Sequence, residues 1–178
     1  MDSYFGNISY CNETTLYISQ TGSSLDALPG CVDPCPLDGS SCAPITASSE
    51  LSAHLDIVKR TGAKAILHGH PKFSVILSMD CDIECESKSE CHKVCPHSRS
   101  VRGIPIVSGE VGTGRYGLCH TVPKAVEKGG GVIVYGHGVF TTGQTDFNEA
   151  FKKLVEIENA CRNEYFVKMG LLFPHPGK

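Results

Sequence analysis

The sequence lacks the features that would place the chain on a nucleic acid or in a membrane. It contains no sustained basic run, and its formal net charge of −3 argues against a surface for nucleic acid. No apolar stretch approaches the roughly 20 residues that a membrane helix needs. The segment Met1–Phe5 combines neither a basic flank nor an apolar core, so we expect no signal peptide and a cytoplasmic location.

The rest of the composition is that of an ordinary folded domain. A chain of 178 residues is normally one domain and is long enough to bury most of its apolar surface. Its 40% hydrophobic and 20% charged residues are typical values, which argues against disorder. No internal repeat is evident. We therefore expect a single domain over residues 1–178.

Cysteine is abundant, and the chain has ten of these residues. Four of them are clustered in a polar stretch of about 80–100, namely Cys81, Cys85, Cys91 and Cys95. Disulfide frameworks are typical of small secreted scaffolds, whereas clustered thiols in a cytosolic protein indicate a metal, an iron–sulfur cluster or a redox-active pair. The spacing differs from the Cys-x2-Cys pattern of common zinc sites. Bound zinc or an iron–sulfur cluster, disulfides and free thiols all stay open.

Hydrophobic periodicity and turn residues predict strands that alternate with helices. The expected strands are a hairpin over 6–19 and runs at 65–67, 104–107 and 132–135, with room for a short strand in the loop 20–47. The expected helices are 48–59 with a serine cap and an end at Gly62, then 73–79, about 123–127, and a long final helix capped by Asp146. On the final helix the expected core face is Phe147, Phe151, Leu154, Ile157 or Glu158, Cys161 and Tyr165. This pattern predicts an α/β fold with one sheet flanked by helices.

Three histidines each lie next to a glycine at the end of an apolar, strand-like run. His68 and His70 stand in Ala65-Ile-Leu-His-Gly-His-Pro71, and His137 stands in Tyr135-Gly-His-Gly-Val-Phe140. In a strand, residues i and i+2 project from the same face, so His68 and His70 can point at one object. Three imidazoles on an apolar scaffold indicate a divalent metal with open coordination positions, the alternative being ordinary core or turn histidines.

Small polar residues recur at turns and at the start of the first expected helix. Hydroxyls, an amide and free backbone N–H groups at a helix start suit a phosphate or a carboxylate. These candidates are Asn7, Thr21, Gly22, Ser48 and Ser49. Glu50 follows them directly, and a carboxylate beside a metal can act as a general base or acid. Its alternative role is that of a glutamate in the first turn of a helix, which complements the helix dipole.

Together these residues resemble the class II aldolase/adducin family, the group of fuculose-phosphate, ribulose-phosphate and rhamnulose-phosphate enzymes. The resemblance covers roughly residues 5–75 and 101–166 and rests on five short motifs in the same order and spacing. They are Gly6-Asn-Ile-Ser9, Ile18-Ser-Gln-Thr-Gly-Ser-Ser-Leu-Asp26, Ser48-Ser-Glu50, His68-Gly-His-Pro71 and Gly136-His-Gly-Val-Phe140. The resemblance implies a three-layer α/β/α fold with a mainly antiparallel sheet, and a homotetramer.

The resemblance also implies roles for the candidate residues. His68, His70 and His137 would bind zinc or a similar divalent metal. Glu50 would move the proton at the carbon next to the substrate carbonyl. The residues that would hold the substrate phosphate are Asn7, Thr21, Gly22, Ser48 and Ser49. The implied reaction is reversible aldol cleavage of a small phosphorylated sugar or sugar acid through a metal-stabilised enediolate.

The chain departs from the family pattern in two places. The family usually has a helix before the Gly-Asn motif, and only Met1–Phe5 precede the motif here, so we expect either that the chain is a domain of a longer protein or that another segment or subunit supplies this helix. No tyrosine occurs between residues 18 and 115, where fuculose-phosphate-type relatives place a proton donor, and the cysteine stretch stands there instead. His92 or His97 could supply the proton, or could join the cysteines as ligands.

The sequence therefore predicts a metal-dependent, class II aldolase-type lyase. A dehydratase or decarboxylase of a sugar phosphate on the same scaffold is the enzymatic alternative, and the missing tyrosine gives it weight. A non-catalytic adducin-like head is less favoured, because the three metal histidines and Glu50 are all present. A redox or regulatory module built on the cysteine cluster is a further alternative.

Overall fold

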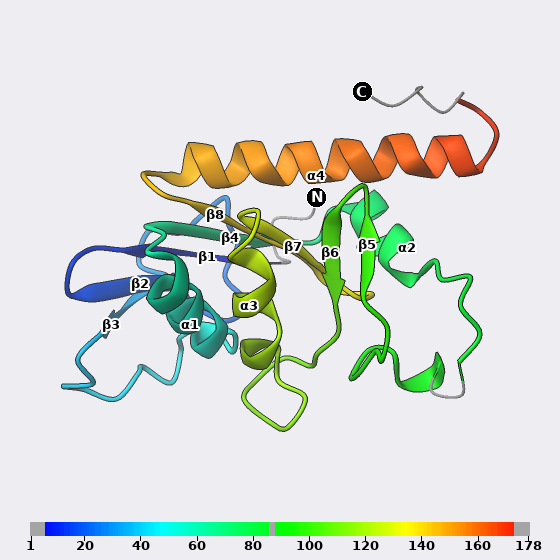
Figure 1. The fold of residues 1–178 in the computed structure, drawn as a ribbon. Helices are drawn as coiled ribbons and strands as arrows, with labels where there is room; N and C mark the ends of the chain where they lie inside the picture. Colours follow the sequence, from blue (N-terminus) through cyan, green and yellow to red (C-terminus); the bar gives the residue numbers. More distant parts are fainter. Residues whose placement is uncertain (1–5, 86–87, 173–178) are drawn as a thin grey trace.

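The computed structural model describes residues 6–85 and 88–172. Within these residues the backbone forms one eight-stranded sheet in the order β3-β2-β1-β4-β8-β7-β6-β5 (Figure 1). The strands are β1 Gly6–Cys11, β2 Thr15–Ser19, β3 Val32–Pro36, β4 Ala65–Gly69, β5 Arg99–Val101, β6 Ile104–Val107, β7 Gly131–Val134 and β8 Gly138–Gly143. The helices are α1 Leu51–Thr61, α2 Lys72–Met79, α3 Val122–Val126 and α4 Phe147–Lys168, with short 3-10 turns at Lys88–Glu90 and Leu118–His120.

Strand β4 lies in the middle of the sheet and carries the first of the three histidines. It pairs antiparallel with β1 on one side and with β8 on the other. This register sets Asn7 of β1 opposite His68, and His68 opposite Phe140 of β8. Six of the seven strand pairs are antiparallel, and β6–β7 is parallel. Residues far apart in the chain thus become neighbours at the centre of the sheet.

Helices cover both faces of the sheet. The long helix α4 runs along one face with α2 beside it, while α1 and α3 pack together on the other (Figure 1). One hydrophobic cluster lies between α1, α3 and the sheet, and another lies between α2, α4 and the sheet. The predicted α/β fold, with one sheet flanked by helices, is confirmed.

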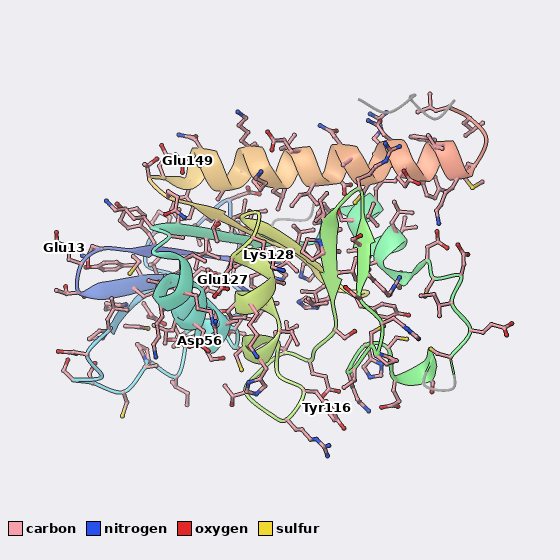
Figure 2. All side chains as sticks on the ribbon, in the orientation of Figure 1. Glu13, Asp56, Tyr116, Glu127, Lys128 and Glu149 are labelled. Carbon is pink, nitrogen blue, oxygen red and sulfur yellow. The ribbon has the colours of Figure 1, made fainter. Side chains whose placement is uncertain are left out.

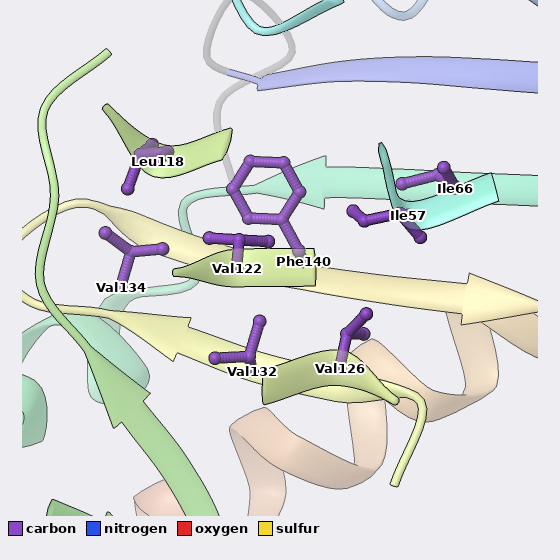
Figure 3. Packing of buried hydrophobic residues seen from close by; sticks show 8 residues of the cluster. All are labelled: Ile57, Ile66, Leu118, Val122, Val126, Val132, Val134 and Phe140. Carbon is purple, nitrogen blue, oxygen red and sulfur yellow. The ribbon is translucent and has the colours of Figure 1, made fainter. Parts of the chain in front are cut away.

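Phe140 is the largest side chain of the cluster under α1 and α3, and it is fully buried. Figure 3 shows its ring among Ile57, Ile66, Leu118 and Val122. Removing such a ring from water stabilises the fold by about 2 to 3 kcal/mol. The ring also stacks on the imidazole of His68, with centroids 4.1 Å apart, so the core directly supports a histidine of the candidate site.

Several predicted helix and strand boundaries are confirmed. The hairpin is β1–β2, and β3 is the short strand for which the loop 20–47 had room. The predicted runs near 65, 104 and 132 are β4, β6 and β7. Gly62 ends α1 in a left-handed conformation, and Asp146 caps α4 by accepting a hydrogen bond from the Glu149 N–H at 3.1 Å.

Other details of the predicted elements are wrong. Helix α1 begins at Leu51 with Glu50 as N-cap, and its cap has no side-chain hydrogen bond. The hydroxyl of Ser48 instead accepts from the Glu50 N–H at 3.3 Å, so this serine shapes the turn before the helix. Phe151 is 53% exposed and does not face the core, although Leu154 and Cys161 do. Strands β5 and β8 were not expected.

Charged side chains lie on the outside of this assembly. Figure 2 labels Glu13, Asp56, Glu127, Lys128 and Glu149, all of which are exposed. Among the described residues, no helix combines the length and the apolar character needed to cross a bilayer.

Candidate metal centre

The three predicted histidines meet at one end of the central strands. His68 is on β4, His70 follows β4 directly, and His137 lies in the turn between β7 and β8. One ring nitrogen from each lies within 4.8 Å of the others, and the Nε2 atoms of His68 and His70 are 3.0 Å apart. A metal ion needs at least three ligand atoms close together, and among the described residues these three histidines form the group that meets this condition.

The backbone fixes the orientation of His68. Its Nδ1 lies 3.1 Å from the carbonyl oxygen of Val139, to which a protonated Nδ1 donates. The lone pair is then on Nε2, the atom that faces His70. A hydrogen bond from the remote ring nitrogen to a backbone carbonyl is the usual support of a metal-binding imidazole.

Glu50 lies beside the three histidines, although it comes from the start of α1. Its Oε1 is 3.1 Å from Nε2 of His137, and its Oε2 accepts a hydrogen bond from Nδ2 of Asn7 at 2.7 Å. Nε2 of His68 is 3.6 Å from the same Oε2. The side chain is only 4% exposed. The carboxylate therefore sits against the imidazoles in a place shielded from bulk water.

Burial and neighbouring groups shift the pKa values of these residues. Burial by itself would raise the pKa of Glu50, but the His137 hydrogen bond, the nearby His68 and the Asn7 amide lower it to about 2. Burial lowers the pKa of His68 to about 3, against the opposing effect of Glu50. Burial and His137 also lower the pKa of His70. At neutral pH the site thus holds an ionised carboxylate at Glu50 and neutral imidazoles at His68 and His70.

This donor set fits a divalent cation. Neutral imidazoles present lone pairs, and three of them with an adjacent carboxylate match the ligands of catalytic sites that keep an open position. The compact spacing of the ring nitrogens and the anchored Nδ1 of His68 supply the geometry. His68, His70 and His137 could therefore hold the metal.

A pocket of about 150 Å³ opens onto the histidines. All the residues predicted for the metal, the catalytic carboxylate and the phosphate line it. The lining is Gly6, Asn7, Gln20, Thr21, Gly22, Ser48, Ser49, Glu50, His68, His70, Val111 and His137. Five segments thus converge on one small cavity, namely β1, the end of β2, the start of α1, β4 and the β7–β8 turn.

Other predicted site residues lie elsewhere. Nε2 of His92 is 4.0 Å from Oε1 of Glu110, and His97 lines a separate cavity beside β6 together with Cys95. Neither histidine lines the 150 Å³ pocket. The clustered cysteines are likewise away from it, between α2 and β5.

Sequence reasoning assigned no role to three residues at or near this pocket. Gln20 and Val111 line it. His54 is fully buried and bonded through Nδ1 to the Ser9 hydroxyl at 2.7 Å. Its position four residues after Glu50, one helical turn away, is a signal that could have identified it. No comparable signal marks Val111, which reaches the pocket from an irregular loop.

Residues 1–165 match the family described as the class II aldolase and adducin N-terminal domain. The chain belongs to this family. The expected membership of the class II aldolase/adducin family is thereby confirmed. No curated protein sequence matches the chain significantly.

Solved structures share the fold at low sequence identity. The L-fuculose-1-phosphate aldolase of Thermus thermophilus is similar with a TM-score of 0.75 and 21% identity, over 96% of this chain and 86% of that one. YgbL of Escherichia coli, described as a candidate aldolase/epimerase/decarboxylase, has a TM-score of 0.71 and 19% identity, over 93% and 80%. The sugar-phosphate aldolase of Thermotoga maritima has a TM-score of 0.67 and 20% identity, over 97% and 89%.

Proposed function

We propose that this chain is a metal-dependent lyase that cleaves a small phosphorylated sugar or sugar acid by reversible aldol chemistry. The observation that carries the proposal is the placement of Glu50 against three histidine side chains in one pocket. Family membership and the fuculose-phosphate aldolase with the same fold support it.

We assign His68, His70 and His137 as ligands of a divalent cation and take zinc as the first choice, since imidazole suits it well. A cation held there would act as a Lewis acid toward the substrate carbonyl and would offset the negative charge that develops on its oxygen in an enediolate-type aldol cleavage. Imidazole coordinates as an uncharged ligand, so three histidine ligands would leave the charge of the cation undiminished. The contacts of His68 with Val139 and Phe140 keep its ring oriented without rearrangement.

Glu50 is the residue that would move a proton at the carbon next to the carbonyl. Its carboxylate is ionised, lines the pocket and is held by Asn7 through one oxygen and by His137 through the other. Burial keeps water away from it. Its position within hydrogen-bond reach of a substrate in the pocket is what a general base needs. The contacts with His137, His68 and Asn7 hold its pKa near 2, so the carboxylate becomes a stronger base when substrate replaces these contacts.

The polar rim of the pocket would hold the phosphate. Its residues are neutral hydrogen-bonding groups, namely Asn7, Thr21, Gly22, Ser48 and Ser49. Among the described residues, no lysine or arginine lines the pocket. The two serines directly precede Glu50, the N-cap of α1, and the free N–H groups and dipole of a helix start favour an anion. Fixing the remote end of the substrate in this way would use binding energy for orientation.

A dehydratase or decarboxylase on the same scaffold is the second candidate. The observation in its favour is that no tyrosine, and neither His92 nor His97, lines the pocket in the part of the chain that the structure describes. The protonation step of an aldol cleavage would therefore need a donor from another subunit or from a rearranged loop. We also propose that residues 1–178 form a single domain, that the protein assembles as a homotetramer and that it is located in the cytoplasm.

The test is a screen of phosphorylated ketoses and sugar acids, with products identified by mass spectrometry. We expect two smaller carbonyl products from a matching substrate, and a loss of at least roughly a hundredfold in rate for Glu50→Gln, in line with general acid–base catalysis. His120→Gln, which alters an exposed histidine outside the pocket, is the matched control and should retain full rate. Water or carbon dioxide as the product would favour the second candidate. Unchanged turnover in Glu50→Gln would contradict the assigned role.

A further inference from the structure

Two loops form most of the polar rim of the histidine pocket, and they run side by side. The Thr21 N–H donates to the Thr46 carbonyl at 2.9 Å, and the Thr21 hydroxyl donates to the Ala47 carbonyl at 3.1 Å. The Ser48 N–H donates to the Ser19 carbonyl at 3.2 Å. The residues of these loops that line the pocket are Gln20, Thr21 and Gly22 after β2, and Ser48 and Ser49 before α1. The spacing of the two loops therefore sets the shape of the rim.

The carboxylate of Asp33, on β3, joins these two loops. Its Oδ1 accepts a hydrogen bond from Nε2 of Gln20 at 2.9 Å, and its Oδ2 accepts one from the Thr46 hydroxyl at 2.7 Å. Asp33 is opposite Ile18 of β2, and the Gln20 N–H continues the ladder by donating to the Cys31 carbonyl at 2.9 Å. Because residues two apart on a strand share a face, Gln20 is a diagonal neighbour of Asp33. One side chain thus holds one residue of each loop.

An aspartate at this position breaks the usual preferences of a strand. Aspartate is depleted in strands, and a buried carboxylate is costly unless it is paired or hydrogen-bonded. Asp33 is only 8% exposed, and no lysine, arginine or histidine in the described ranges 6–85 and 88–172 forms an ion pair with it. The donors from the two pocket loops stabilise it instead. Such a break with local preference is typical of functional sites.

We propose that Asp33 is a positioning residue of the pocket, which sets the spacing of the two rim loops by holding Gln20 and Thr46. The inference rests on the proposed function, because it takes this rim as the seat of the substrate phosphate. Groups that are ordered before the ligand binds reduce the entropic cost of binding. With Asp33 in place, both loops are held at their binding distance in the free protein.

Asp33 acts through its two partners and not by contact with the substrate. A carboxylate repels a phosphate, and Asp33 is not part of the pocket lining. Gln20 does line the pocket, and its side chain ends on the Asp33 carboxylate. The hydrogen bonds of Asp33 are thus transmitted to the rim by Gln20 on one side and by the segment that leads from Thr46 to Ser48 on the other.

Loss of this contact should affect substrate binding more than the chemical step. Glu50 follows the second loop directly, but Asn7 and His137 hold its carboxylate at 2.7 and 3.1 Å. The ring of His68 is anchored separately, on the carbonyl of Val139. Neither contact involves the partners of Asp33. Removal of the Asp33 carboxylate should therefore raise KM while kcat stays close to that of the wild type.

The first test measures the contact between the loops and needs no substrate. Amide hydrogen exchange, followed by NMR, should be about tenfold faster at Thr21 and Ser48 in Asp33→Ala and in Thr46→Val, as expected when a hydrogen bond to a charged group is lost. Thr46→Ser keeps the hydroxyl donor, and Asp38→Ala changes an exposed aspartate after β3. Both variants should keep the wild-type rates.

The amide of Leu67, in the middle of β4, is the internal reference of this test, because its exchange reports opening of the central sheet. Wild-type exchange at the two loop amides of Asp33→Ala would overturn the proposal. Equal acceleration at Leu67 would also overturn it, because the change would then be a general loss of stability. Thr46→Val alters an exposed side chain and covers the case of a misfolded Asp33→Ala chain.

The second test measures binding, with glycerol 1-phosphate as the probe and glycerol as its phosphate-free counterpart. In titration calorimetry, Asp33→Ala and Thr46→Val should bind the probe about tenfold more weakly than the wild type and Thr46→Ser do. With a substrate from the screen, KM should rise by the same factor and kcat should change by less than about twofold. Wild-type affinity in both Asp33→Ala and Thr46→Val would overturn the proposal. A wild-type chain that does not bind the probe would instead contradict the phosphate seat, and hydrogen exchange would still decide whether Asp33 holds the loops.

Discussion

At the scale of single residues, position 138 shows how much the metal centre depends on a missing side chain. A Cβ atom on Gly138 would lie 2.5 Å from the carbonyl oxygen of Gly69, 2.8 Å from Cδ2 of His70 and 2.9 Å from Cε1 of His68. These are backbone and ring atoms of the site itself, so they cannot move aside without displacing the imidazoles. Position 138 therefore requires glycine, because its backbone lies too close to Gly69 and to the two imidazoles for any side chain to fit.

We predict that Gly138→Ala lowers stability by about 1 to 3 kcal/mol, as overpacking of a core does, and weakens metal binding at the histidines. Gly129→Ala is the matched control, since a Cβ there meets nothing within 4 Å. Calorimetric titration with zinc and urea unfolding measure the two effects. Equal metal affinity in both variants would contradict the role given to Gly138.

His54 makes the folding stability depend on pH. Burial lowers its pKa from 6.5 to about 4 in the folded chain, although Glu50 acts in the opposite direction. Between these two values the unfolded chain binds a proton that the folded chain does not, so stability falls as the pH is lowered from about 6.5 to 4. The full loss from this residue is about 3 kcal/mol.

We predict that His54→Gln weakens the pH dependence of the free energy of unfolding within that window and leaves it unchanged above about pH 7. Urea unfolding at a series of pH values, with wild-type and His120→Gln chains in parallel, measures the slope. Release of metal from other histidines at low pH affects all three chains equally, so the difference isolates His54. A slope equal to that of the wild type would refute the assignment.

Some of these residues could be predicted from the sequence and others could not. The trio of histidines follows from the two-residue spacing and the strand-like runs, because side-chain direction alternates predictably along a strand. Glu50 and the phosphate-seat residues were identified by resemblance, since an isolated serine or glycine in a turn carries little information. Val111 gains its position from tertiary packing, which no local pattern encodes, whereas His54 could have been identified from its spacing of one helical turn after Glu50.

At the scale of elements, α4 holds the start of α2. Helix α2 has Pro71 as N-cap and no capping side chain of its own. The carboxylate of Glu158 on α4 accepts hydrogen bonds from the Phe73 and Ser74 N–H groups at 3.0 and 2.9 Å, and from the Ser74 hydroxyl at 2.8 Å. Glu158 of α4 thus caps the N-terminus of α2, the helix that begins directly after His70 and Pro71.

We predict that Glu158→Gln lowers the free energy of unfolding by about 2 kcal/mol, the usual value of hydrogen bonds to a charged group. Glu156→Gln, an exposed position on the same helix paired with Lys153 at 3.5 Å, should change it by less than about 0.5 kcal/mol. Urea denaturation of both variants provides the comparison. Indistinguishable midpoints would show that α2 does not depend on α4 for its first turn.

Elements with a long periodic pattern were predictable, and those defined by pairing were not. Helix α4 repeats apolar residues along its 22 residues and has a strong cap at Asp146. Strand β5 has three residues and exists only through its pairing with β6. Strand β8 starts two residues after a turn glycine and contains two threonines, so its pattern resembles a loop although all six residues are buried. Helix α1 begins later than its serines suggest because they shape the pocket rim instead.

At the scale of the whole molecule, the site exists only when the sheet is assembled. Asn7 and His68 are opposite one another on β1 and β4, Glu50 is added from α1, and His137 is added from the turn before β8. These segments lie far apart in the sequence and meet only through the pairing of the central strands. A metal bound by the histidines therefore ties β4 to the β7–β8 turn and should stabilise the folded state against the unfolded chain.

We predict that zinc at about a thousandfold excess over its dissociation constant raises the free energy of unfolding by about 4 kcal/mol at the histidine site. Removing it with a chelator should lower the melting temperature accordingly, and His137→Ala should lose that share of the effect. His120→Ala, at an exposed histidine, should respond as the wild type does. Differential scanning calorimetry with and without chelator measures the effect of zinc on the melting temperature of each chain. If His137→Ala and the wild type gained equally from zinc, the three histidines would not form the metal centre.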